Sequence, residues 1–258
     1  MKVVILAGGY GSRLGNHTQA VPKPMIRVGG KPLLWHIMKI YSHFGFSDFL
    51  VSLGYKADVV KEYFLNFERY NNDFTIDLAT GSVAVHDRER SEPWKVTLVD
   101  TGLDTLKGAR IKRMENYLDE VNMLTYGDGV ADVNLPALLA FHKSHGKVLT
   151  ISGVRPPSRF GEMVEAGDRV ARFEEKPQAS CGRINGGYMV FNRGLLEELT
   201  TDVNCDLEHG AIDRLVSREE VMMYRHDGQW ACVDHERDLM HLNRMWSSGE
   251  AFWKLWKD

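Results

Sequence analysis

Apolar side chains follow two alternating patterns along the first 145 residues. Uninterrupted apolar runs between turn residues predict buried strands over residues 2–6, 49–53, 96–99 and 121–126. Apolar residues at intervals of three and four predict amphipathic helices over residues 32–44, 57–67 and 135–142. Strands that alternate with helices favour right-handed crossovers and therefore a mostly parallel sheet.

The second half of the chain has fewer helical stretches between its apolar runs. Strands are predicted over residues 147–154, 169–173 and 184–191, and helices over residues 207–216 and 236–246. These strands indicate an antiparallel or mixed layer attached to the first sheet, and the polar, irregular residues 71–93 indicate an excursion from it. Because no repeat or flexible linker divides the chain, we predict a single α/β domain over residues 1–258. Its Rossmann-like, mostly parallel sheet is flanked by helices and joined by a smaller antiparallel β layer.

Composition narrows the class of protein. The chain has 258 residues, 43% of them hydrophobic, and 32 basic against 35 acidic residues give a formal net charge of −3. So many apolar residues at so low a net charge exclude a disordered chain. The small excess of acidic over basic residues argues against a general nucleic-acid binder. No apolar run is long enough to span a bilayer, and no cleavage site follows the first apolar run. The three cysteines, Cys181, Cys205 and Cys232, lack disulfide or zinc spacing, which favours a cytoplasmic protein with free thiols.

The glycine-rich segment Leu6-Ala-Gly-Gly-Tyr-Gly-Ser-Arg-Leu14 follows the first predicted strand. Glycines there let the main chain approach a ligand closely and present its N–H groups to phosphate. The dinucleotide fingerprint is excluded because Leu14 stands where its third glycine is required, and the P-loop is excluded because Pro32 follows Gly30 and Lys31. We therefore expect a different phosphate loop, in which Arg13 can donate two hydrogen bonds to phosphate.

Lys23 lies between two prolines, in the segment Pro22-Lys-Pro-Met25. Because proline fixes the backbone, its ammonium projects from a stiff segment, as the stabilisation of charge in a transition state requires. Taken alone, however, the segment is better explained by a surface lysine between turn prolines.

Two carboxylates follow strand-like runs, and a third lies near one of them in sequence. Asp128 comes directly after the strand predicted over residues 121–126, where ligands of parallel sheets collect, and its flanking glycines leave room for Mg²⁺. Asp132 is a further carboxylate or the first residue of a helix. Asp234 ends the short run Trp230-Ala-Cys-Val-Asp234 and is either a second metal ligand or the N-cap of the helix over residues 236–246.

Two polar segments suit a small polar substrate. Glu174-Glu-Lys-Pro177 places Glu175 and Lys176 at a strand end. Ile184-Asn-Gly-Gly187 places Asn185 before two glycines on a strand, where a ligand can approach the backbone. Together these segments fit the phosphate and hydroxyl groups of such a substrate.

Aromatic residues are concentrated near the C-terminus, at Trp246, Phe252, Trp253 and Trp256. They are expected to pack the last helix onto the body of the protein. A subunit contact is the alternative, because tryptophan is enriched at interface anchors.

The segments GGYGSRL, PKPM, GGKP, YGDG, EKP and INGG, with a late Trp and Asp, resemble the sugar-1-phosphate nucleotidyltransferases over nearly the whole chain. The segments LWHIMK, EPWKVTLVDTG, YGDGVAD and RFG are similar to those of the CTP-using members of that family. The resemblance implies the nucleotide-diphospho-sugar transferase fold and the Mg²⁺-dependent transfer of CMP from CTP to a sugar 1-phosphate, with glucose 1-phosphate expected first. It also implies a homo-oligomer.

The resemblance implies a role for each segment, with residues 1–145 mainly binding the nucleotide and residues 146–258 mainly the sugar phosphate. Arg13 on the phosphates and Lys23 on the leaving pyrophosphate would be the catalytic residues. Mg²⁺ would be bound by Asp128 and Asp234. The nucleotide would contact Leu6, Ala7, Gly8, Gly9, Gly11, Ser12, Arg13, Lys23, Arg110, Gly127 and Asp128. The sugar phosphate would contact Tyr126, Glu175, Lys176, Asn185, Gly186 and Gly187.

Several residues differ from the family pattern. Ser12 replaces the usual threonine of the loop but keeps its hydroxyl, and Val21 stands where relatives carry lysine. Residues 231–233, 152–157 and 178–182 also depart from the pattern. Because these changes lie around the sugar half, they weaken the assignment of glucose more than that of CTP.

Two other functions stay open for this sequence. A CTP-dependent enzyme for another phosphorylated acceptor, a different hexose 1-phosphate or a non-sugar phosphate, would keep the same nucleotide site. A non-catalytic sensor of nucleotide sugars would be expected to lack Arg13, Lys23, Asp128 or Asp234, all of which are present.

Overall fold

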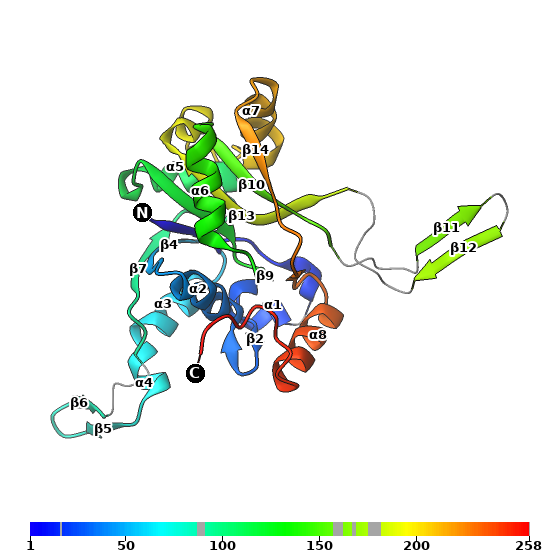
Figure 1. The fold of residues 1–258 in the computed structure, drawn as a ribbon. Helices are drawn as coiled ribbons and strands as arrows, with labels where there is room; N and C mark the ends of the chain where they lie inside the picture. The colour runs from blue at the N-terminus through cyan, green and yellow to red at the C-terminus, as the bar shows by residue number, and fades with distance from the viewer. Residues whose placement is uncertain (16, 87–90, 157–161, 167–168, 175–181, 258) are drawn as a thin grey trace.

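A seven-stranded sheet forms the centre of the protein (Figure 1). The computed structural model describes residues 1–15, 17–86, 91–156, 162–166, 169–174 and 182–257. In spatial order the strands are β14 (Val221–Arg225), β10 (Leu149–Val154), β13 (Ile184–Asn192), β8 (Val121–Tyr126), β1 (Val3–Leu6), β4 (Asp48–Leu53) and β7 (Lys95–Asp100). Only β13 runs antiparallel to its neighbours, so the predicted mixed, mostly parallel sheet is confirmed.

The sheet is covered on both faces, which explains why its strands are continuous apolar runs. Val3 and Ile5 of β1 point into one core, and Val4 and Leu6 point into the other. The first core is built against α2 (Leu33–His43), α3 (Ala57–Leu65), α6 (Leu135–His145) and α8 (Glu236–Ser247). The second is built against α5 (Lys107–Arg113) and α7 (Asp213–Ser217).

Some elements differ from the sequence-based prediction. The helix expected over residues 57–67 is interrupted at Asn66, so that α3 is followed by a separate α4 (Phe67–Asn71). The helix expected over residues 207–216 begins as an irregular π-helical segment, η6 (Leu207–Ile212), because Gly210 adopts φ 146°. Neither α5 nor β14 was predicted.

The strands β10 and β13, which were predicted to belong to an attached layer, are instead part of the central sheet. The other antiparallel strands form small two-stranded sheets. These pairs are β2 (Arg27–Val28) with β3 (Lys31–Pro32), β5 (Phe74–Asp77) with β6 (Ser82–Val85), β9 (Gly129–Ala131) with β15 (Trp230–Cys232), and β11 (Glu162–Ala166) with β12 (Arg169–Glu174). No helix in the described ranges combines the length and the apolar content needed to cross a membrane.

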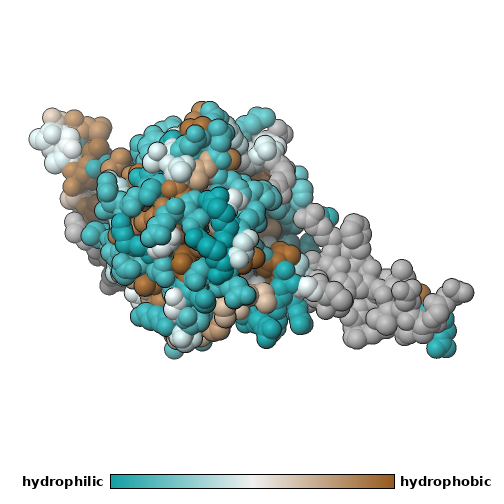
Figure 2. Space-filling model, turned by 90° about the horizontal axis from the view of Figure 1, so that it is seen from above, coloured by the Kyte–Doolittle hydropathy of each residue, from teal (hydrophilic) through white to brown (hydrophobic). Residues whose placement is uncertain are grey.

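The β5–β6 hairpin forms the predicted excursion and projects from the body of the protein (Figure 1). Phe74 pairs with Val85 and Ile76 with Val83, so the four side chains share one face of the hairpin. Phe74 and Ile76 are exposed, and Figure 2 shows apolar atoms at this end of the molecule. The hairpin therefore presents an apolar face that its own chain leaves partly uncovered.

The aromatic residues at the C-terminus pack onto α2, as expected. Trp253 is fully buried, and its ring lies 6.1 Å from that of His36. Trp246 and Trp256 also contact His36, at ring-centroid distances of 4.7 and 6.3 Å. The last residues of the chain therefore complete the core around α2.

His36 makes the stability of this cluster depend on pH. Its Nε2 lies 2.8 Å from the carbonyl oxygen of Val28 and so donates, whereas its Nδ1 accepts from Trp253 Nε1 at 3.3 Å. Both nitrogens are thus satisfied by the neutral ring, and burial lowers the pKa of His36 to about 4. The unfolded chain takes up a proton near pH 6.5, so this contribution to stability is complete above that pH and is lost as the pH falls towards 4.

We expect His36 to lower the free energy of unfolding by about 3 kcal/mol between pH 7 and pH 4. Urea denaturation at a series of pH values measures this dependence. As the pH falls, the free energy of unfolding of His36→Gln should decline less steeply than that of the unsubstituted protein. His43→Gln, at the exposed end of α2, is the matched control and should leave the decline unchanged. Equal slopes for all three proteins would contradict the assignment.

Candidate active site

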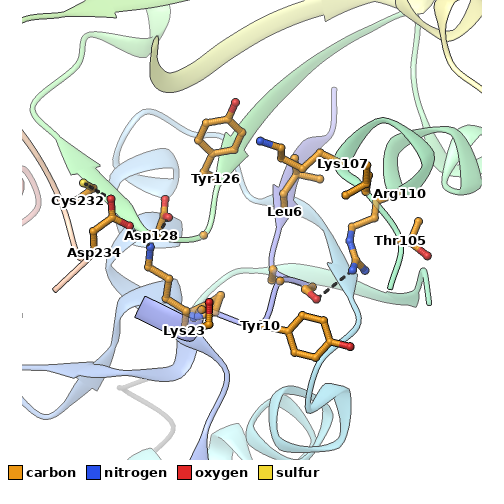
Figure 3. Close-up of a pocket in the computed structure, with 18 of the residues that line it drawn as sticks. Leu6, Tyr10, Lys23, Thr105, Lys107, Arg110, Tyr126, Asp128, Cys232 and Asp234 are labelled. Atoms are coloured by element: carbon orange, nitrogen blue, oxygen red, sulfur yellow. Dashed lines mark hydrogen bonds and ion pairs between the residues drawn. The ribbon is translucent and has the colours of Figure 1, made fainter. Parts of the chain in front are cut away.

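A pocket of about 610 Å³ opens at the carboxyl ends of β1 and β8 (Figure 3). Its walls come from the glycine-rich segment, the Pro22–Met25 turn, the segment before and within α5, and the end of β15. Loops that follow neighbouring parallel strands meet at one edge of a sheet, which is why these distant segments converge. The predicted site residues that line the pocket are Leu6, Ala7, Gly8, Gly9, Gly11, Ser12, Lys23, Arg110, Tyr126, Gly127, Asp128 and Asp234.

Asn185, Gly186 and Gly187 lie beside two residues of the pocket wall. Asn185 Nδ2 donates to the Tyr126 hydroxyl at 3.0 Å, and Trp230 Nε1 donates to the carbonyl oxygen of Gly186 at 2.8 Å. Gly187 has φ +80°, and a side chain there would meet the Tyr126 ring at 2.9 Å. These three residues therefore fix the Tyr126 and Trp230 rings.

Three predicted site side chains cannot be placed. Glu175 and Lys176 lie outside the described residues, and so does the side chain of Arg13. The main chain of Arg13 belongs to a short 3₁₀ helix, η1 (Ser12–Leu14), directly after the glycines.

Lys23 connects the two predicted metal ligands. Its Nζ lies 2.7 Å from Asp128 Oδ2 and 2.7 Å from Asp234 Oδ1. Burial opposes its charge, but the two carboxylates outweigh burial and raise the pKa of Lys23 above its ordinary value. Lys23 is therefore a charged group of the pocket, and the alternative of an ordinary surface lysine is wrong.

Asp234 is not the N-cap of α8. The N-cap is His235, which forms a capping box with Asp238. The main-chain N–H of Asp234 donates to Asp238 Oδ2 at 3.0 Å, while its side chain faces Lys23. Asp132, the other ambiguous carboxylate, is bonded to His226 at 3.0 Å and does not line the pocket.

The Asp128 and Asp234 carboxylates suit a hard cation. Both converge on one position, where the Lys23 ammonium serves as a stand-in for a positive ion. Among the described residues no group of three or more His, Cys, Asp or Glu side chains could hold a metal. Mg²⁺ commonly uses one or two carboxylates together with water and substrate phosphate. The donor set therefore fits a Mg²⁺ ion that arrives with a phosphate ligand.

Arg110 braces the wall of the pocket on the side away from the carboxylates (Figure 3). Its Nη2 donates to the carbonyl oxygens of Gly8 and Leu103, both at 3.0 Å, and its Nη1 donates to those of Leu53 and Gly102 at 2.9 and 2.8 Å. A side chain at Gly8 would meet Arg110 Nη1 at 2.1 Å and would displace the guanidinium from its carbonyl partners. The terminal nitrogens of Arg110 thus fix the main chain on which a nucleotide would lie.

A cluster of side chains behind Tyr126 was not predicted from the sequence. The Tyr126 hydroxyl donates to Glu208 Oε1 at 2.5 Å, and Lys107 Nζ lies 2.5 Å from the same oxygen. Burial and the Glu208 carboxylate raise the pKa of Tyr126, which keeps its hydroxyl a donor. No local pattern indicates this cluster, because Glu208 belongs to the irregular η6 and is 82 residues from Tyr126.

Cys232 also lines the pocket, with its Sγ 3.8 Å from Asp234 Oδ2. Burial, followed by the charge of Asp234, raises the pKa of its thiol to about 12. Because the thiolate is the nucleophilic form, Cys232 is not suited to covalent catalysis at neutral pH. Cys205 is likewise a free thiol, and Cys181 lies outside the described residues.

Known proteins resemble the chain over its whole length. The family model described as nucleotidyl transferase matches residues 2–249. Glucose-1-phosphate cytidylyltransferase of Salmonella typhimurium is 44% identical over 259 residues, which cover 100% of both chains. The Bacillus subtilis protein named "Probable glucose-1-phosphate cytidylyltransferase" is 40% identical over 257 residues, covering 99% of this chain and 100% of that protein. The solved structure of UDP-glucose pyrophosphorylase with UDP-glucose shares the fold, with a TM-score of 0.68 at 15% identity over 96% of this chain and 98% of that one.

Proposed function

Because the chain belongs to the nucleotidyl transferase family, we propose that it transfers CMP from CTP to glucose 1-phosphate, giving CDP-glucose and pyrophosphate. The observation that carries the proposal is the full-length similarity to glucose-1-phosphate cytidylyltransferases at 44 and 40% identity. The pocket supports it, since a glycine-rich loop, a partly buried ammonium and two carboxylates suit a nucleoside triphosphate with its metal.

The acceptor supplies its own nucleophile in this reaction. The second pKa of a phosphate monoester is about 6, so glucose 1-phosphate carries a dianionic phosphate at neutral pH. One of its oxygens attacks the α-phosphorus of CTP, and the bond from that phosphorus to the bridging oxygen of the β-phosphate breaks as pyrophosphate leaves. No proton has to be removed, so no general base is required, and catalysis depends on position and charge.

Three side chains of the pocket act on the negative charge of the triphosphate and of the leaving pyrophosphate. Asp128 and Asp234 would hold Mg²⁺, which would neutralise part of the charge of the triphosphate. Lys23 neutralises the charge that develops on pyrophosphate, because its flanking prolines fix its backbone.

The remaining roles follow the family pattern. Arg13 binds the phosphates of CTP, Lys176 binds the phosphate of the sugar, and Glu175 with Asn185 binds its hydroxyl groups. Residues 1–145 thus mainly serve the nucleotide, and residues 146–258 mainly the sugar phosphate. Asp234 is an exception, because it serves the reacting centre from the second part of the chain.

We also propose that the protein is a cytoplasmic homo-oligomer that binds no nucleic acid. The apolar face of the β5–β6 hairpin supports self-association, since Phe74 and Ile76 remain exposed in the single chain. Cys205 and Cys232 are free thiols, which supports a reducing compartment.

Pyrophosphate release is the direct test of the proposed reaction. The protein is incubated with Mg²⁺, glucose 1-phosphate and, in turn, CTP, UTP, dTTP, GTP or ATP, and released pyrophosphate is measured. We expect release with CTP alone, and none when glucose 1-phosphate is omitted. If CTP raises the melting temperature but yields no pyrophosphate, glucose 1-phosphate is the wrong acceptor. If CTP neither binds nor reacts, the proposed function is wrong.

A further inference from the structure

Tyr10 and Asp104 join two loops across the pocket, and the reaction described above uses neither of them. Tyr10 lies in the glycine-rich segment after β1, whereas Asp104 lies between β7 and α5. The Tyr10 hydroxyl donates to Asp104 Oδ1 at 2.6 Å, although the two residues are 94 positions apart. Both side chains line the pocket.

The position of this pair assigns it to one end of a bound nucleotide. Lys23 contacts both Asp128 and Asp234, and in the proposed reaction these three residues mark the place where the α-phosphorus reacts. Tyr10 lies on the other side of the pocket, towards Arg110 (Figure 3). In a nucleoside triphosphate the ribose and base extend from the α-phosphate away from the β-phosphate. In the proposed orientation the α-phosphate lies at these carboxylates and the base lies on the side of Tyr10.

The Tyr10 ring is held by side chains rather than by a stiff backbone. Its neighbours in the chain are Gly9, which has open space around it, and Gly11, which has φ +64°. The ring of Tyr55 lies 5.1 Å from that of Tyr10 at an interplanar angle of 43°. Asp104 holds the hydroxyl and raises the pKa of Tyr10, so the phenol remains a donor at neutral pH. With 45% of Tyr10 exposed, part of its surface remains available to a ligand.

We propose that Tyr10 is the stacking platform for the base of the nucleotide and that Asp104 is the residue that positions it. An aromatic face binds a planar base with little regard to its hydrogen-bonding edge. The pair therefore contributes affinity for the nucleotide rather than the preference for cytosine. This inference rests on the proposed function, because it takes the ligand of the pocket to be a nucleoside triphosphate.

Calorimetric titration with CTP and Mg²⁺ tests the inference, with steady-state kinetics beside it. We expect Tyr10→Ala to raise the Kd for CTP about 10-fold or more through the lost stacking. Tyr10→Phe and Asp104→Asn should each raise it about 3- to 10-fold, because each removes or weakens the same hydrogen bond. The double variant with both Tyr10→Phe and Asp104→Asn should bind CTP no more weakly than either single variant. KM for CTP should rise, while KM for glucose 1-phosphate and kcat should stay within about 2-fold of their values in the unsubstituted protein. We expect this because Tyr10 and Asp104 contribute to the binding of CTP and have no role in the chemical step.

An abasic ligand and matched variants separate stacking from a general disturbance of the loop. Ribose 5-triphosphate should bind all variants as it binds the unsubstituted protein, because it lacks the base. Tyr70→Ala and Asp73→Asn, at exposed positions outside the pocket, should bind CTP normally. Thermal unfolding checks that each variant is folded. If Tyr10→Ala is not folded, the Kd of Tyr10→Phe for CTP tests the inference.

Several outcomes would overturn the inference. These are normal CTP binding by the Tyr10 variants, an equal loss of affinity for ribose 5-triphosphate, and additive effects of Tyr10→Phe and Asp104→Asn. If the unsubstituted protein binds CTP and forms product while its variants behave normally, only the inference is wrong. If the unsubstituted protein does not bind CTP, the proposed function is wrong as well.

Discussion

Replacing Lys23 by alanine will lower kcat for pyrophosphate release by about 10²- to 10³-fold, equivalent to about 3–4 kcal/mol of transition-state stabilisation. The loss is large because the ammonium is fixed and mostly buried. Its side chain is only 14% exposed, and its short helix starts between Pro22 and Pro24. A mobile surface cation could be replaced by solvent ions, whereas this one acts at a defined position.

Lys143→Ala is the matched control for this substitution, because Lys143 is exposed on α6 and does not line the pocket. It should leave kcat unchanged. Lys23→Ala should also bind Mg²⁺ more tightly than the unsubstituted protein when nucleotide is absent, since it removes a cation that competes for Asp128 and Asp234. Unchanged kinetics would show that Lys23 has no part in the reaction.

Asp128→Asn is expected to nearly abolish turnover, with a loss of at least about 10²- to 10³-fold, while the protein stays folded. Asparagine keeps the size of the side chain but removes the negative charge that Mg²⁺ requires of its ligand. Circular dichroism and melting temperature should remain close to those of the unsubstituted protein, because Asp128 is partly exposed and outside both cores.

Asp132→Asn provides the comparison, since Asp132 lies four residues further on and is bonded to His226 away from the pocket. We expect it to retain near-normal turnover. Near-normal turnover of Asp128→Asn with Mg²⁺ would remove Asp128 from the metal site. Equal losses in both variants would indicate that the substitutions disturb the segment as a whole.

The parts of the fold that were predicted are those in which burial dictates the sequence. The buried strands β1, β4 and β8 were placed within one residue of their observed bounds, and α2 within one residue at each end. Each of these elements has a continuous apolar run or an apolar face directed at the core, so its pattern is local.

The elements that were missed depend on contacts far away in the chain. The segment Lys107–Arg113 that forms α5 is mostly basic, and its helix is held in place by Arg110, which donates to carbonyl groups of three other segments. Its short length left too few apolar residues to reveal a helical period. Similarly, β14 is only partly buried and pairs with β10, which is far from it in sequence.

The residues of the candidate site likewise divide into those that a local motif indicates and those that depend on distant contacts. Asp128 was predicted from a local motif, because it directly follows a buried strand, whereas for Lys23 and Asp234 the local motif left an alternative open and the family resemblance favoured a place in the site. Glu208 and Asp104 were not identified, because each acts through a partner more than 80 residues away. Chemistry carried by a loop motif could be read from the sequence, but the groups that orient it could not.

The antiparallel strand β13 has a consequence for biosynthesis. It lies between β8 and β10 in the sheet. Neither of these two strands can therefore pair with β13 until residue 192 has left the ribosome. The 66 residues from Tyr126 to Asn192 take roughly 3–13 s to synthesise at 5–20 residues per second. For that time β8 offers an unpaired apolar edge to other nascent chains. The yield of folded protein should therefore fall when many ribosomes translate closely spaced copies of the chain.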